Sequence, residues 1–141
     1  MNVFIEDDSE AARESPRATL SEFHDVNIVA YAADEALAIE QINLLLPDVV
    51  FLDLNLQPGT GVAVLKNIKK HRGKIKVMSF ANCNGELYVN ACKHANADYF
   101  FDKSFQFMEV REVFLYRNRT SQLNKKYDSK PAKSHGKFWI N

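Results

Sequence analysis

The feature that most limits the fold of this chain is a repeated alternation between short apolar segments and segments with helical spacing. The apolar segments are rich in Val, Ile and Phe, and they are Val3–Ile5, Val26–Ala30, Val49–Leu52, Ile75–Phe80 and Tyr99–Phe101. Near-continuous apolar runs of this length are typical of strands that are covered on both faces of a parallel sheet. Five strand–helix alternations therefore predict a doubly wound α/β domain with right-handed crossovers.

Two of the intervening segments carry the clearest helical pattern. Residues 36–46 present one apolar face, and Asp34 is the expected N-cap because its side chain can accept from the first free backbone N–H groups. Residues 62–68 repeat the pattern. The lysines of this second segment are expected to face water, and they are Lys66, Lys69 and Lys70.

Three further helices complete the expected pattern. Residues 87–95 and 107–114 have apolar residues at helical intervals. A first helix is predicted over 9–23, with a kink or a late start at Pro16, because proline removes a backbone donor and clashes with the preceding turn.

Length and composition indicate one compact domain. The chain has 141 residues, of which 46% are hydrophobic and 26% charged, and this leaves little room for a second domain. No apolar run is long enough to span a bilayer, and the first ten residues lack the basic start of a signal peptide. The two cysteines, Cys83 and Cys92, form no disulfide framework. A cytoplasmic location is therefore expected.

The zero net charge hides a division along the chain. Seven of the 18 Lys and Arg residues lie in residues 117–141, together with one of the 18 acids. Residues 1–116 hold the other eleven bases and seventeen acids, so their formal net charge is −6, whereas that of residues 117–141 is +6. We expect residues 119–141 to form a flexible basic tail, which contains one apolar patch at Phe138-Trp139-Ile140 and no DNA-binding motif.

Acidic residues follow two of the expected strands. Glu6, Asp7 and Asp8 follow the first strand, and Asp53 ends the third. The usual topology places these strands side by side, and ligands of such sheets bind at the carboxyl ends of the strands. Magnesium prefers oxygen ligands, so the cluster is a candidate Mg²⁺ site. The alternative is a solvated acidic loop edge, but Asp53 ends an apolar strand, where a charge is costly unless it is paired.

Lys103 directly follows the fifth strand. It can direct a positive charge at the acidic cluster or at a phosphoryl group bound there. A simple ion pair is the alternative, and the pattern does not separate the two.

Four motifs in this order and spacing resemble the receiver domain of two-component response regulators. They are VFIEDDSEAARES, VVFLDLNLQPGTGVAVL, KVMSFAN and NADYFFDKS, and the similarity covers about residues 2–117. The resemblance implies a flavodoxin-like (CheY-like) three-layer αβα sandwich, with a five-stranded parallel sheet of order 2-1-3-4-5 and five helices. The receiver would then occupy residues 1–118.

The resemblance implies a Mg²⁺ site. Asp7 and Asp8 match the acidic pair that holds the metal, and Arg13, five residues past Asp8, supports this alignment. Glu6 with Asp7 is an alternative register. Asn55 matches the residue whose backbone carbonyl is a further ligand.

The resemblance also assigns the phosphoryl chemistry. Asp53 matches the phosphoacceptor, which is itself a metal ligand, and Lys103 matches the lysine that contacts the phosphoryl oxygens. Phe100 matches the aromatic switch position, although an aromatic residue in this strand can equally be part of the core. No catalytic residue is expected beyond these.

One departure from the family concerns the end of the fourth strand. The family has Thr or Ser there, whereas the ungapped alignment places Ala81. Ser79 lies two residues earlier on the same side of the strand, and it could substitute only if the strand were shifted or bulged. Loss of the hydroxyl should leave phosphorylation possible but weaken its coupling to movement of the following loop.

The resemblance predicts a signalling protein rather than an enzyme, with at most self-phosphorylation and self-dephosphorylation that need Mg²⁺. It would accept a phosphoryl group from a histidine kinase or a histidine phosphotransfer protein. It would signal to a downstream protein through the face of the fourth helix, fifth strand and fifth helix, as a monomer or weak dimer. We expect a stand-alone receiver, or a receiver cut from a longer protein.

Two other functions remain open from the residues. Ala81 favours a pseudo-receiver that binds partners independently of phosphate. The sequence Asp53-Leu54-Asn55 resembles the nucleophile motif of haloacid-dehalogenase-like phosphatases, but that family has its nucleophile on the first strand and an acid two residues later.

Overall fold

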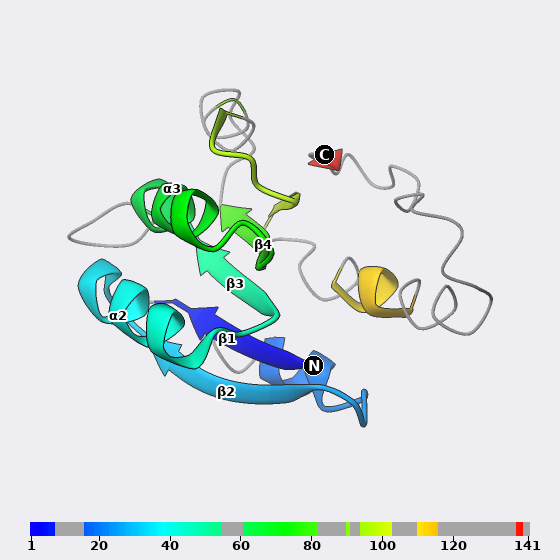
Figure 1. The fold of residues 1–141 in the computed structure, drawn as a ribbon. Coiled ribbons are helices and arrows are strands. Elements are labelled where there is room, and N and C mark those ends of the chain that lie inside the picture. The colour runs from blue at the N-terminus through cyan, green and yellow to red at the C-terminus, as the bar shows by residue number, and fades with distance from the viewer. Residues whose placement is uncertain are drawn as a thin grey trace.

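A computed structural model describes residues 1–7, 16–54, 61–81, 90, 94–102, 110–115 and 138–139 of the chain. These residues form one sheet of strand order β2-β1-β3-β4-β5-β6 (Figure 1). Its strands are β1 (Asn2–Glu6), β2 (Asn27–Ala32), β3 (Val49–Asp53), β4 (Lys76–Ala81), β5 (Tyr99–Asp102) and β6 (Phe138–Trp139). The first five pair in parallel, which confirms the predicted order 2-1-3-4-5.

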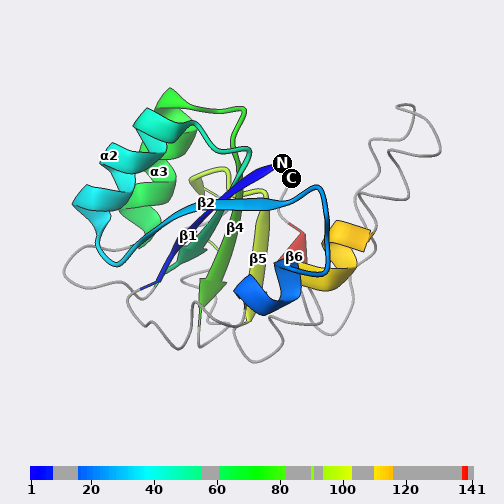
Figure 2. The ribbon, with the colours of Figure 1, turned by 90° about the horizontal axis from the view of Figure 1, so that it is seen from below.

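Helices cover both faces of the sheet. Figure 2 shows α2 (Glu35–Leu45) and α3 (Gly61–His71) on one face, here called the α2–α3 face. The helical residues 16–20 and 110–115 lie on the opposite face. The three-layer arrangement is therefore confirmed. Residues 8–15 and most of the predicted helix at 87–95 lie outside the described residues, so the prediction at Pro16 stays a prediction.

Local signals set both ends of α2. Asp34 is its N-cap and accepts a hydrogen bond from the Leu37 backbone N–H at 2.9 Å, as predicted. The helix ends at Leu45, one residue earlier than expected. Leu46 turns into the left-handed region with φ 48°, and its N–H donates to the Ile42 carbonyl at 2.9 Å.

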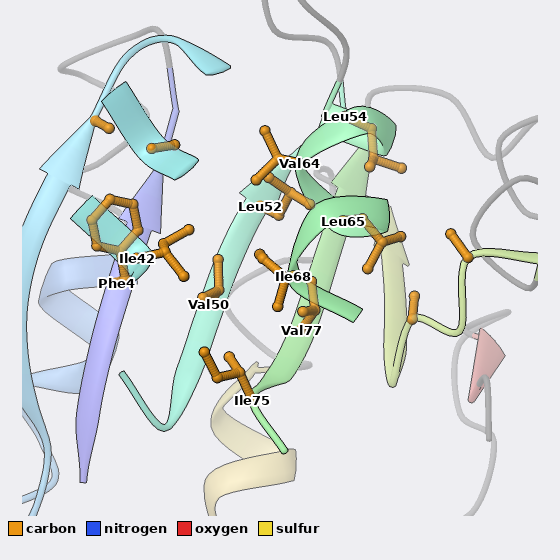
Figure 3. Close-up of a cluster of buried hydrophobic side chains, with 14 of the residues drawn as sticks. Phe4, Ile42, Val50, Leu52, Leu54, Val64, Leu65, Ile68, Ile75 and Val77 are labelled. Atoms are coloured by element: carbon orange, nitrogen blue, oxygen red, sulfur yellow. The ribbon is translucent and has the colours of Figure 1, made fainter. Parts of the chain in front are cut away.

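Strand alternation divides the core between the two faces. On β1, Phe4 packs against the α2–α3 face, whereas Val3 and Ile5 pack on the opposite face. Figure 3 shows the first of these two clusters, in which side chains of β1, β3 and β4 pack against α2 and α3. The near-continuous apolar strands of the sequence are thus explained by burial on both faces.

One lysine that was expected to face water is instead part of a buried network. The Lys69 Nζ donates to the Asp98 Oδ2 at 2.5 Å and to the Ile75 carbonyl at 2.6 Å, and its side chain is only 9% exposed. Asp98 also accepts from the Val77 backbone N–H at 2.8 Å. The prediction was correct for Lys66 and Lys70, which are exposed, and wrong for Lys69, because a buried carboxylate lies within its reach.

Candidate functional site

Asp7 and Asp53 lie at the carboxyl ends of adjacent strands. Glu6 pairs with Leu52 in the β1–β3 register, so Asp7 follows β1 at the level where Asp53 ends β3. The Asp7 backbone N–H donates to the Ala32 carbonyl at 3.1 Å, which extends the pairing of β1 with β2 by one residue. Both side chains are buried, with Asp7 7% and Asp53 3% exposed. The structure therefore brings these two predicted site residues together.

Glu6 is also buried, but on the other face of the sheet. Successive side chains of a strand point to opposite faces of the sheet. The side chain of Glu6 therefore lies on the α2–α3 face, as that of Phe4 does, whereas Asp7 lies on the same face as Ile5, which is the other one. Glu6 is 1% exposed, and neither of its carboxyl oxygens has a hydrogen-bond partner. A buried carboxyl without partners is destabilised in its charged form.

Burial is the largest cause that raises the pKa of Glu6, to about 9, and repulsion from Asp53 is the next. Glu35, Asp34 and Asp7 add smaller repulsions. Glu6 therefore carries a proton at neutral pH and adds no negative charge to the neighbourhood of Asp53. No sequence signal separated this carboxyl from Asp7 and Asp53, because the shift in its pKa comes mainly from burial in the fold.

The carboxylate oxygens of Asp7 and Asp53 are the donor type that Mg²⁺ prefers, so they fit this cation chemically. Within the described residues, no three His, Cys, Asp or Glu side chains are grouped closely enough to hold a metal ion. Asp8, Asn55 and Lys103 lie outside those residues. Their predicted roles as ligands and as the phosphoryl-contacting lysine therefore stay predictions.

The end of β4 lacks a hydroxyl. The β3–β4 register runs without a shift from Val49 opposite Lys76 to Asp53 opposite Phe80, so the strand holds no bulge that would move Ser79 toward its end. Ala81 is the last residue of β4 and is fully buried. Ser79 is fully buried two residues earlier, and its Oγ has no hydrogen-bond partner. The condition under which Ser79 could replace the missing hydroxyl is therefore not met.

Gly61 is a site residue whose role the sequence did not reveal. It begins α3, and a Cβ built on it would lie 2.2 Å from the Asp53 carbonyl oxygen and 2.7 Å from the Leu54 Cα. Only a residue without a side chain allows α3 to start against the end of β3. The close contact of this position with Asp53 comes from the tertiary structure and has no signal in the neighbouring sequence.

Residues 3–114 match the family model described as the response regulator receiver domain. The chain belongs to this family. The receiver is 27% identical over 103 residues to the DNA-binding transcriptional activator EvgA of Escherichia coli K12, a match that covers 73% of this chain and 50% of EvgA. It is 31% identical over 100 residues to a protein-glutamate methylesterase/protein-glutamine glutaminase of Leptospira interrogans, covering 70% of this chain and 29% of that protein. The chain spans half or less of the length of these relatives.

Solved structures show the same fold. The signal receiver domain of the putative response regulator NarL from Mycobacterium tuberculosis aligns with TM-score 0.75 and 26% identity, over 84% of this chain and 95% of that one. The response regulator domain of Thermotoga maritima CheB aligns with TM-score 0.72 and 23% identity, over 89% and 98%. The second likeness concerns the fold alone.

Phe100, the switch position of the resemblance, is a core residue of this receiver. It is 1% exposed, lies opposite Ser79 in the β4–β5 register and packs in the cluster of the α2–α3 face. Its role as a switch stays a prediction.

No helix in the part of the chain that the structure describes is long and apolar enough to cross a membrane.

Proposed function

We propose that this receiver accepts a phosphoryl group on Asp53 from a histidine kinase or a histidine phosphotransfer protein. The observation that carries the proposal is the burial of Asp53 beside Asp7 at the ends of two adjacent strands. Ligands of open parallel sheets bind at the carboxyl ends of the strands, and Asp53 is the last residue of β3 at that edge. Receivers as a family bind Mg²⁺, and the oxygen donors of this edge fit that cation.

Asp7, Asp8, Asp53 and the Asn55 backbone carbonyl would hold the cation. We give Glu6 no part in this, because its carboxyl lies across the sheet from Asp7 and Asp53 and is protonated at neutral pH. When bound, Mg²⁺ would neutralise charge on the oxygens of the transferring phosphoryl group.

Asp53 would be the nucleophile. One of its carboxylate oxygens forms a bond to phosphorus while the phosphorus–nitrogen bond of the donor phosphohistidine breaks, and the imidazole leaves with the electron pair. No separate general base is needed, because a carboxylate is itself the nucleophile. Lys103 would contact the phosphoryl oxygens and offset their charge. The chain would catalyse no reaction beyond its own phosphorylation and dephosphorylation.

The phosphorylated receiver would signal by binding a downstream protein, through the face that contains β5. Ala81 favours a second function, in which the chain binds its partner independently of phosphate. The unshifted register of β4 supports this alternative, because no hydroxyl of that strand reaches its end. Coupling between the phosphoryl group and the binding face would then be weak or absent.

The first test is incubation with acetyl phosphate and Mg²⁺, followed by intact mass measurement. The wild-type chain should gain one phosphoryl group, and Asp53→Asn should gain none. Asp48→Asn is the matched control, because Asp48 is an exposed carboxylate at the other end of β3, where it accepts from the Asn2 backbone N–H. No added mass on the wild type, while a known receiver is labelled in parallel, would reject phosphorylation.

The second test separates the two functions. Once a partner is found, its affinity is measured with and without Mg²⁺ and beryllofluoride, for wild type and for Ala81→Thr. A wild-type affinity that changes tenfold or more supports phosphorylation-dependent signalling. An affinity that changes only in Ala81→Thr supports the phosphate-independent function.

A further inference from the structure

The C-terminal part of the chain supplies a strand to the receiver sheet. β6 pairs antiparallel with β5, with Trp139 opposite Tyr99 and Phe138 opposite Phe100. In Figure 2 this short strand lies beside β5, at the end of the sheet away from β2. The pairing falls within the segment for which we expected flexibility, and the rest of that segment lies outside the described residues.

The position of β6 matters because β5 would otherwise be an edge strand. An edge strand presents unpaired backbone N–H and C=O groups, and these accept an extended segment of another chain. Both faces of β5 are covered, with Phe100 and Phe101 at most 1% exposed, so an extended segment can reach this strand only along the edge that β6 occupies. Phe100, which pairs with Phe138, also belongs to the core cluster of the α2–α3 face.

Charge favours occupation of this edge by the chain's own tail. Residues 117–141 carry seven bases and one acid, whereas residues 1–116 carry seventeen acids and eleven bases. Segments of opposite net charge attract each other, and a tethered segment binds without the entropy loss of bringing in a second molecule. A segment of another protein that competes with the tail for this edge would be attracted by the same acidic charge of residues 1–116 if the segment were basic and apolar.

We propose that Phe138–Trp139 is a built-in ligand of the β5 edge, and that a downstream protein binds there by displacing it with an extended, basic and apolar segment of its own. This inference goes beyond phosphoryl transfer and does not depend on it. A receiver that never accepts phosphate would still show competition at this edge.

The test uses the full chain with Phe138→Pro and Trp139→Pro together. Proline has no backbone N–H and cannot continue a strand pair, so the tail should leave β5 while the domain stays folded. Hydrogen exchange of the peptide that contains residues 99–102 should be at least tenfold faster than in the wild type. Ser134→Pro, which leaves Phe138 and Trp139 unchanged, is the matched control and should exchange like the wild type.

A second measurement adds a fluorescent peptide of residues 133–141 and follows its anisotropy. The double-proline chain should bind it, with an affinity that falls as salt is added, and the wild type should bind at least tenfold more weakly. A peptide that itself carries both prolines should bind neither protein. Equal exchange in all chains, or equal peptide binding by wild type and variant, would overturn the proposal. The proposal would also be overturned if the protein were a dimer that dissociates on dilution and if slow hydrogen exchange of residues 99–102 were lost at the same time. The strand beside β5 would then come from a second copy of the chain.

Discussion

Glu6 shows how one position in a strand decides the state of a carboxyl group. The same run of three acids contains Asp7, which ends beside Asp53, and Glu6, which lies across the sheet with no hydrogen-bond partner. Both residues are acidic, but they lie in different environments because successive side chains of a strand point to opposite faces of the sheet. Burial then holds Glu6 in its neutral form.

This difference predicts a pH dependence of stability. The pKa of Glu6 is raised to about 9 in the folded chain, from 4.5, so between these values the folded state holds a proton that the unfolded state has lost. Relative to Glu6→Gln, the free energy of unfolding of the wild type should fall by about 1.4 kcal/mol per pH unit as pH rises through this window. Urea unfolding without Mg²⁺, from pH 5 to 9, measures the difference.

Glu40→Gln is the control for this prediction, because Glu40 is an exposed residue of α2. Its stability should follow the wild type at every pH. Parallel curves for wild type and Glu6→Gln would show that Glu6 is ionised in the folded protein.

The Ser79 hydroxyl is a second residue-scale case. Its buried Oγ has no partner, so Ser79→Ala should raise the free energy of unfolding by about 1 kcal/mol through loss of the desolvation penalty. Chemical denaturation checks this. Ser21→Ala is the control, since the exposed Ser21 hydroxyl donates to the Ala18 carbonyl at 2.6 Å and its loss should not stabilise. A stability loss in Ser79→Ala would point to a partner for this hydroxyl.

At the scale of elements, the apolar runs predicted all five parallel strands within a few residues. The spacing of apolar residues and the capping residues are local signals, and Asp34 caps the start of α2 as expected. The start of α3 depends instead on a contact between elements. α3 begins at Gly61 because the end of β3 lies against that position, and nothing within the helix sequence records this contact.

Gly61→Ala should therefore disturb β3, the strand that ends at Asp53. A Cβ 2.2 Å from the Asp53 carbonyl oxygen forces the backbone of β3 or α3 to move, with a loss of about 1–3 kcal/mol in stability. Phosphorylation by acetyl phosphate should slow as well, because Asp53 moves with its backbone.

Gly73→Ala is the matched control for this change. A Cβ at Gly73 meets only the Lys69 carbonyl oxygen at 3.7 Å, which is ordinary contact. Its labelling rate should equal that of the wild type. Equal labelling of both alanine variants would show that β3 tolerates the added atom.

For the whole molecule, one buried ion pair joins three elements at the end of the sheet opposite the site. Asp98 precedes β5, Lys69 lies on α3, and the Val77 N–H belongs to β4. Asp98→Asn should lower the free energy of unfolding by about 3 kcal/mol, because it leaves the Lys69 ammonium buried without its counter-ion. Thermal and urea unfolding measure this.

The exposed pair of Arg111 and Glu22, 2.8 Å apart, supplies the control. Glu22→Gln should change stability little, since solvent screens this pair. Equal losses in the two variants would show that burial does not strengthen the Asp98 network.

The sequence by itself determined the parallel sheet, its strand order and the placing of Asp7 and Asp53 at one edge. Alternating burial and short-range capping are written in neighbouring residues, and the order of strands is the one that the resemblance to the receiver family implied. The tertiary structure alone decided that Glu6 is neutral, that Lys69 is buried and that β6 covers β5. Each of these depends on atoms far apart in the sequence, whose distances only the packed fold sets.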